Sequence, residues 1–191
     1  LVQEWSKVQK SYPDINLQMI PYMNSQENAR EILKNLGTNI DVVGGIFDET
    51  MLALRQCAGL ELSRQRICCA VSLNHRLAGK DLLTYEDLYG ENFLMMHRGW
   101  SNYVDELRDD IWKNHPQIHV VDFDIYSLEI FNQCENSNDV LMAAENWKDV
   151  HPLLKIIPVE WKYTIPYGIL YSQKPSDLVK RFLKAMKKAR Q

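Results

Sequence analysis

Residues 66–99 constrain the fold more than any other stretch of this sequence. The stretch begins with an apolar run, 67–73, which is short enough to be a buried strand. A polar break follows, after which Thr84 is placed to cap a short helix whose Leu88 faces inward. A second apolar run, 92–96, ends at polar residues. Two short strands joined in this way predict part of an α/β domain.

The composition limits the kinds of protein that this chain can be. At 191 residues it is long enough for one large domain or two small lobes. Its 46% hydrophobic and 25% charged residues are typical of a soluble globular protein. The net charge of −3 is too mild to indicate a nucleic-acid-binding surface. No apolar run approaches the roughly 20 residues that span a bilayer, so we expect no membrane contact. Cysteines without a disulfide framework favour the cytoplasm as the location.

The first ten residues do not resemble a signal peptide, since they contain Gln, Glu, Ser and Lys. The chain begins without Met and within a helical pattern, so we expect it to be part of a longer protein. The four cysteines lack the spacing of a disulfide framework or a metal site. We interpret them as packing residues in a reducing compartment: Cys57, Cys68, Cys69 and Cys134.

Strand and helix patterns alternate along the chain, which predicts an α/β fold with mainly parallel sheets. The predicted strands are 15–20, 40–43, 67–73, 92–96, 118–125, 139–143 and 163–172. Predicted helices follow Asn24 or Ser25, occupy 102–114, follow Ser127 and occupy 177–188. The first two strands and the helix between them imply a parallel pair with a right-handed crossover. The inward residues of the two longest helices should be Val104, Leu107, Ile111 and Trp112, and Leu178, Phe182, Leu183 and Met186.

Ligands of open α/β sheets bind beyond the carboxyl ends of the strands, which directs attention to three strand-to-helix junctions. A helix N-terminus at each junction favours an anion. His97, Arg98 and Ser101 together can clamp a carboxylate, and Gly44-Gly45 allows close backbone approach. The alternative is that the junction serines only cap helices and that Arg98 is a solvated loop residue. The candidate ligand-binding residues are Asn24, Ser25, Gly45, Phe47, His97, Arg98, Ser101, Tyr126 and Ser127.

Catalytic and metal sites are poorly supported. The sequence contains no nucleophile elbow, Walker motif or dinucleotide-binding glycine motif. Asp122 and Asp124 share one face of a strand, but a solvated strand face is the more common explanation of such a pair. His115 and His119 flank Pro116 and lack an obvious third ligand. We expect no enzyme activity, no metal and no cofactor.

The order of segments resembles the effector-binding domain of LysR-type transcriptional regulators. The motif His75-Arg76-Leu77-Ala78 follows a strand, and Leu83, Leu88 and Phe93 stand where that family has apolar anchors. Three features depart from the family pattern. Arg76 replaces the usual Pro, residues 136–138 replace a Gly-rich turn, and a first strand before the opening helix is absent.

The resemblance implies a periplasmic-binding-protein-like type II fold with two lobes joined by two crossover strands. The first lobe would contain residues 1–72 and 166–191, and the second 73–165. It also implies a small-molecule effector between the lobes, assembly as a homodimer or tetramer, and DNA binding only through an N-terminal domain outside this chain. The alternative is a solute-binding protein of the same fold that serves transport.

Overall fold

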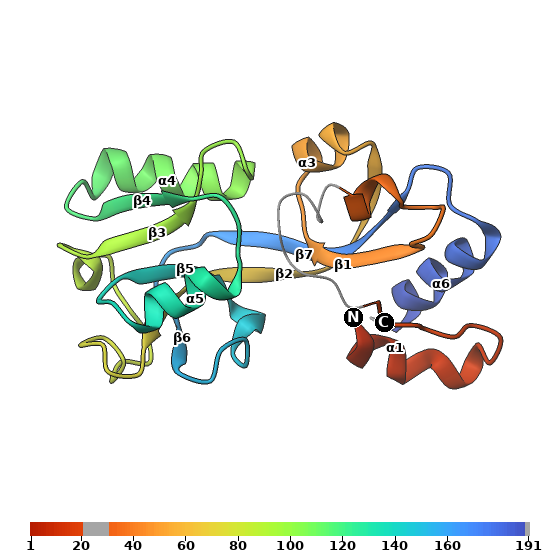
Figure 1. Ribbon diagram of the computed structural model, residues 1–191, viewed down its shortest axis with the longest axis horizontal. Helices are drawn as coiled ribbons and strands as arrows, with labels where there is room; N and C mark the ends of the chain where they lie inside the picture. Colours follow the sequence, from red (N-terminus) through yellow and green to blue (C-terminus); the bar gives the residue numbers. More distant parts are fainter. Residues whose placement is uncertain (21–30, 190–191) are drawn as a thin grey trace. The chain divides into compact units, whose positions relative to one another are not determined.

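The computed structural model describes residues 1–20 and 31–189, whose contacts divide into two compact units (Figure 1). The first unit contains Leu1–Arg64 and Pro166–Gln191, and the second contains Gln65–Ile165. The strands β2 (Cys57–Ser72) and β7 (Thr164–Ser172) each contribute residues to both units. The chain therefore passes from one unit to the other along strands.

The first unit combines a small antiparallel sheet with helices. Strand β1 (Val42–Ile46) pairs antiparallel with β7, and Gly45 lies opposite Gly168. The helices are α1 (Val2–Val8), the 3-10 helix η1 (Gln9–Ser11), α3 (Glu49–Leu54) and α6 (Asp177–Lys188). Residues 31–34 are also helical, and Gly37, with φ +86°, follows that helix as predicted.

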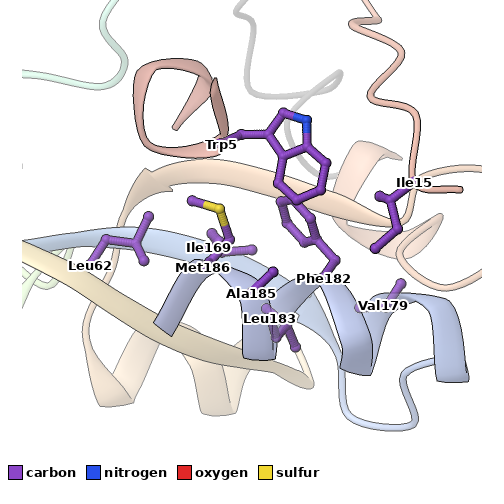
Figure 2. Packing of buried hydrophobic residues seen from close by; sticks show 9 residues of the cluster. All are labelled: Trp5, Ile15, Leu62, Ile169, Val179, Phe182, Leu183, Ala185 and Met186. Carbon is purple, nitrogen blue, oxygen red and sulfur yellow. The ribbon is translucent and has the colours of Figure 1, made fainter. Parts of the chain in front are cut away.

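The core of the first unit forms where α1 and α6 meet. Trp5 of α1 packs on Phe182 of α6 with ring centroids 5.2 Å apart. Figure 2 shows the buried members of this core: Trp5, Ile15, Leu62, Ile169, Val179, Phe182, Leu183, Ala185 and Met186. The inward face predicted for α6 is confirmed except at Leu178, which is 45% exposed. Val179 is buried in its place.

The strand predicted at 15–20 does not form. The Ile15 N–H donates to the Tyr12 carbonyl at 3.1 Å, which makes a turn, and only Ile15 is buried. Met19 and Ile20 are largely exposed, so the apolar alternation has no buried sheet face to occupy. The predicted parallel pair is therefore also wrong: its first strand is missing, and β1 pairs antiparallel with β7 instead. The predicted helix starts, Asn24 and Ser25, lie outside the described residues.

Gly168 permits the closest backbone approach in the first unit. A Cβ atom at this position would lie 2.0 Å from the carbonyl oxygen of Leu60. A real Cβ atom cannot approach backbone so closely, so only glycine allows β7 and β2 to lie as near as they do.

Five strands of the second unit pair in the order β6–β2–β5–β3–β4, as part of a seven-stranded sheet that also includes β7 and β1. Besides β2, the strands of this unit are β3 (Asn92–Met96), β4 (His119–Phe123), β5 (Val140–Ala144) and β6 (Leu154–Pro158). Its helices are α4 (Asn102–Asn114) and α5 (Leu128–Glu135), with the short 3-10 helices η2 (Glu86–Leu88) and η3 (Glu145–Trp147). The bounds predicted for β3 and α4 are confirmed.

The prediction of mainly parallel sheets is wrong, because β1 and β7 pair antiparallel and the strands of the second unit run in both directions. Strands β3, β4 and β5 are parallel to one another, whereas β2 runs antiparallel to both β5 and β6. Alternating strands and helices predict parallel neighbours only where a helix joins adjacent strands. Only the short η2 separates β2 from β3 along the chain, and β1 pairs with a strand from the far end of the sequence.

The loop between β2 and β3 is fixed by its own polar groups. The Thr84 hydroxyl accepts from the Asp87 N–H, and the Asp87 carboxylate accepts from the Thr84 N–H. This reciprocal pair confirms the predicted cap, and Leu88 is fully buried. Arg76, which stands where the LysR family has Pro, binds the Glu91 carboxylate at 2.6 Å.

Candidate functional site

Three parallel strands of the second unit end at the same edge of the sheet. In the β3–β4 register Met96 lies opposite Phe123, and in the β3–β5 register Leu94 lies opposite Leu141. The residues that follow these strands, 97–101, 124–127 and 145–147, therefore gather at one place, which we call the carboxyl edge. Ligands of open α/β sheets bind at such edges.

The loop between β3 and α4 is a tight turn. The His97 N–H donates to the Phe123 carbonyl at 3.0 Å, which ties the loop to β4. The His97 Nδ1 lies 2.9 Å from the Arg98 carbonyl and must carry a proton to donate to it. Gly99 has φ +84°, and its N–H donates to the Asp105 carboxylate at 2.9 Å. This left-handed residue turns the chain into α4.

Ser101 begins α4 without making the expected side-chain cap. Its carbonyl accepts the Asp105 N–H at 2.9 Å, but its Oγ has no hydrogen-bond partner among the described residues. The residue is only 2% exposed. A buried hydroxyl without a partner is rare and calls for an explanation.

Arg108 is a buried cation beneath the carboxyl edge that the sequence analysis missed. Its guanidinium donates to the Met96 carbonyl at 2.5 Å and binds the Asp122 carboxylate at 2.7 Å. These contacts join α4 to the C-terminal ends of β3 and β4. The available signal was its position on α4, between the inward residues Val104 and Ile111. Because Asp122 pairs with Arg108, the predicted Asp122–Asp124 pair offers no free carboxylate pair for a metal.

Arg98 is engaged by Asp109 on α4, and both side chains are more than half exposed. The hydrogen bond that Arg98 donates to the Asp109 carboxylate raises the pKa of Arg98 above its ordinary value. The guanidinium that was predicted to clamp a ligand carboxylate thus binds a carboxylate of the chain itself.

Five aromatic side chains form a cluster at the carboxyl edge, which we call the aromatic cluster: Trp100, Phe123, Tyr126, Phe131 and Trp147. Tyr126 is its centre. The centroids of Trp147 and Phe123 lie 4.6 and 4.8 Å from that of Tyr126, and Trp100 lies at 6.4 Å. The Tyr126 hydroxyl donates to the Met142 carbonyl at 2.8 Å, and burial raises the pKa of Tyr126 well above 10.

The remaining predicted ligand residues lie in different surroundings. Ser127 precedes α5, where its hydroxyl donates to the Glu129 carboxylate and lowers the pKa of Glu129. Gly45 and Phe47 belong to the first unit. Phe47 is buried in a core cluster with Cys57 and Leu170. The second unit thus brings together His97, Arg98, Ser101, Tyr126 and Ser127, whereas Asn24 and Ser25 lie outside the described residues.

The other candidate chemical groups are structural. His115 stacks on Tyr85 at 3.7 Å and bonds the Tyr89 hydroxyl through Nδ1. All four cysteines are buried and free, and burial raises the pKa of Cys68 to about 11 and that of Cys134 to about 12. Within residues 1–20 and 31–189, no His, Cys, Asp and Glu side chains form a group of three that could hold a metal ion. No helix of that part of the chain is both long and apolar enough to cross a bilayer.

Comparison with known proteins gives matches of structure alone. No family model matches the chain, and no curated protein matches its sequence. The crystal structure of CbnR, a LysR family transcriptional regulator, aligns with the whole chain at a TM-score of 0.71 and 11% identity. The chain has the fold of LysR-type effector-binding domains. It spans 65% of the length of CbnR.

Two further structures support the likeness to LysR-type domains. The effector-binding domain of QuiR in complex with shikimate aligns over 99% of this chain and 86% of its own, with a TM-score of 0.65 and 18% identity. The regulatory domain of CcmR from Synechocystis PCC6803 in complex with 2-PG aligns over 100% and 90%, with a TM-score of 0.61 and 14% identity. The resemblance inferred from the sequence is confirmed at the level of the fold.

Proposed function

We propose that this chain is the small-molecule effector-binding domain of a LysR-type transcriptional regulator. The observation that carries the proposal is the carboxyl edge, which is built where the fold places ligands. It gathers His97, Ser101 and the aromatic cluster within one unit of a chain whose whole length matches LysR-type domains. That QuiR and CcmR were crystallised with small molecules supports the same interpretation.

In this proposal the lobes of a type II periplasmic-binding-protein-like fold correspond closely to the two units, although the units divide earlier within β2, at residues 64 and 65. Residues 1–72 and 166–191 form the first lobe, residues 73–165 form the second, and β2 and β7 are the two crossover strands. The effector binds between the lobes, where Asn24, Ser25 and Gly45 are the proposed contacts of the first lobe; Phe47 is buried in a core cluster and is not among them. Effector binding favours one angle between the lobes, and that change of population is the regulatory signal.

The intact protein would bind DNA through an N-terminal domain that precedes residue 1, and would act in the cytoplasm as a homodimer or tetramer. Reading the coding sequence upstream of Leu1 tests this part directly. About ninety residues that contain a helix-turn-helix support it. A secretory signal peptide followed by a short strand would replace it with the second candidate, a solute-binding protein that serves transport.

The proposed effector is anionic and contacts the second lobe through His97, Arg98, Ser101, Tyr126 and Ser127. Arg98 already binds a carboxylate, that of Asp109, so its planar donors suit an acidic effector that displaces it. Replacing Arg98 with Ala should abolish binding of an effector identified by a thermal-shift screen. Unchanged affinity would show that Arg98 does not contact the effector. Effector affinity should be measured for His97→Ala as well. If only Arg98→Ala loses binding, the effector depends on that one contact; if both variants lose it, the whole loop between β3 and α4 is needed.

A further inference from the structure

We infer that the effector is an aromatic carboxylate whose ring lies against Trp100, Phe123 and Trp147. The inference rests on the proposed function, and it names the chemical class that the carboxyl edge is built to bind.

The first argument is where the aromatic side chains come from. Trp100 follows β3, Phe123 ends β4 and Trp147 ends the turn after β5, so each of the three parallel strands supplies one ring. All three side chains are partly exposed. By contrast, Trp5 and Trp161 are buried, with 4% and 6% exposure, so not every tryptophan of the chain is left partly exposed. Partly exposed aromatic rings gathered at a ligand-binding edge indicate recognition of an apolar, planar group.

The second argument is that the rings are held in place before a ligand arrives. Tyr126 lies behind them, and its ring makes interplanar angles of 67° with Trp100, 78° with Phe123 and 83° with Trp147. The Tyr126 hydroxyl is fixed to the Met142 carbonyl of β5. Such edge-to-face contacts order the rings, so a ligand ring that binds them does not have to order them itself.

The third argument concerns the polar part of the ligand. Ser101 is adjacent to Trp100 in the chain and stands at the N-terminus of α4, a helix of 13 residues. Its buried Oγ has no partner among the described residues, although a serine at this position usually caps its helix. An acidic group of the ligand would accept a hydrogen bond from this hydroxyl and would be favoured by the helix N-terminus, against the repulsion of the Asp105 carboxylate in the first turn of α4. A ring next to such an acid is an aromatic carboxylate.

The competing occupant is a cation. Asp124 and Glu145 immediately follow β4 and β5 at the same edge. Aromatic rings beside carboxylates bind ammonium groups through cation–π contacts. An anionic ligand and a cationic ligand can be distinguished with simple compounds, so one titration series decides between them.

The experiment titrates the 191-residue chain with matched pairs of acids and follows tryptophan fluorescence and thermal stability. The pairs are benzoate with cyclohexanecarboxylate, phenylacetate with cyclohexylacetate, and 2-naphthoate with its fully saturated analogue. Benzylammonium is the cationic probe. At least one aromatic acid should bind at least about tenfold more tightly than its saturated partner, because only a planar ring can stack on the cluster.

Two variants locate the binding. Trp147→Leu keeps an apolar side chain and should weaken binding of the preferred aromatic acid by about tenfold or more. Trp112→Leu is the matched control, because Trp112 lies on α4 with 80% exposure and outside the aromatic cluster. It should leave the affinity unchanged. Thermal unfolding of both variants shows whether each one folds.

The results that overturn the inference are equally specific. Equal affinity for aromatic and saturated acids would show that the site does not require an aromatic ring. Tighter binding of benzylammonium would show that it prefers a cation to a carboxylate. Absence of binding by every acid up to about 10 mM, where even weak ligands bind, would also overturn it. A helix-turn-helix in the upstream coding sequence, found together with any of these results, would leave the proposed function standing.

Discussion

Arg108 shows how a single charged side chain can shape a binding edge without belonging to the ligand contacts. It sits on the buried face of α4 and donates to the end of β3 while pairing with Asp122 of β4. Its Nε has no partner among the described residues. A buried charge of this kind stabilises the fold only while its partners remain.

Replacing Arg108 with Ala should lower the free energy of unfolding by about 2–4 kcal/mol, because the change removes both bonds and the packing of the side-chain stem. Arg108→Met should recover part of that loss by keeping the apolar stem. Arg98→Ala is the control: both partners of its ion pair with Asp109 are more than half exposed, so the loss should be far smaller than that for Arg108→Ala. Urea unfolding measures all three. An equal loss for Arg108 and Arg98 would contradict the role given to burial.

At Gly168 the controlling factor is space rather than charge. Gly168→Ala would place a Cβ atom 2.0 Å from the Leu60 carbonyl oxygen, so one strand must move. We expect a loss of at least about 2 kcal/mol in the free energy of unfolding.

Gly79→Ala is the matched control for Gly168→Ala, because no heavy atom lies within 4 Å of its added Cβ. Its free energy of unfolding should change by less than about 0.5 kcal/mol. Chemical unfolding of the two variants side by side makes the comparison. A stable Gly168→Ala protein would show that β2 and β7 lie farther apart than described.

At the scale of elements, helix starts can look equivalent in sequence and differ in structure. Ser176 caps α6 by accepting the Val179 N–H at 3.3 Å, whereas the Oγ of Ser101 makes no such bond at α4. Ser176→Ala should therefore lower the free energy of unfolding by about 1 kcal/mol, and Ser101→Ala by less than about 0.5 kcal/mol. Denaturant midpoints of the two variants test this. A larger loss at Ser101 would mean that its hydroxyl caps α4 after all.

An element could be predicted from the sequence where its own residues determine its structure, and not where its structure depends on distant parts of the chain. Strand β3 and helix α4 carry strong apolar periodicity between clear end signals, and their bounds were predicted correctly. Residues 15–20 also alternate, but alternation makes a strand only where a partner edge is present, and that depends on the rest of the chain. Trp112 fits the helical period of α4 yet is 80% exposed, whereas Arg108, one turn before it, is buried.

The candidate site was partly predictable for a similar reason. His97 and Ser101 stand at a strand-to-helix junction that the sequence makes visible. The grouping of Trp100, Phe123 and Trp147 around Tyr126 depends on the order of three strands in the sheet, which periodicity does not give. The pairing of Arg98 with Asp109 likewise depends on a rotamer and not on a motif.

For the molecule as a whole, buried acidic groups predict a loss of stability in alkali. Burial raises the pKa of Cys68 from 9.0 to about 11 and that of Cys134 to about 12. In the unfolded chain these thiols ionise near pH 9, so above that pH unfolding releases protons and becomes easier.

The contribution of these thiols to the free energy of unfolding should therefore be constant below pH 9 and fall between pH 9 and about 11, by up to ~1.4 kcal/mol per pH unit for each thiol. Urea titrations at a series of pH values measure the slope. Cys68→Ala combined with Cys134→Ala should make it shallower. An unchanged slope in the double variant would assign the alkaline loss to other groups, such as buried Tyr126.

The division of the chain into units has a consequence for its synthesis. The second unit is one continuous stretch, Gln65–Ile165, so its synthesis is complete before α6 is made. The first unit must wait for α6, because Trp5 packs on Phe182 of that helix, which is translated after the second unit. During that interval the apolar face of α1 has no partner helix. The segment that contains α1 is thus a part of the nascent protein that chaperones are expected to hold.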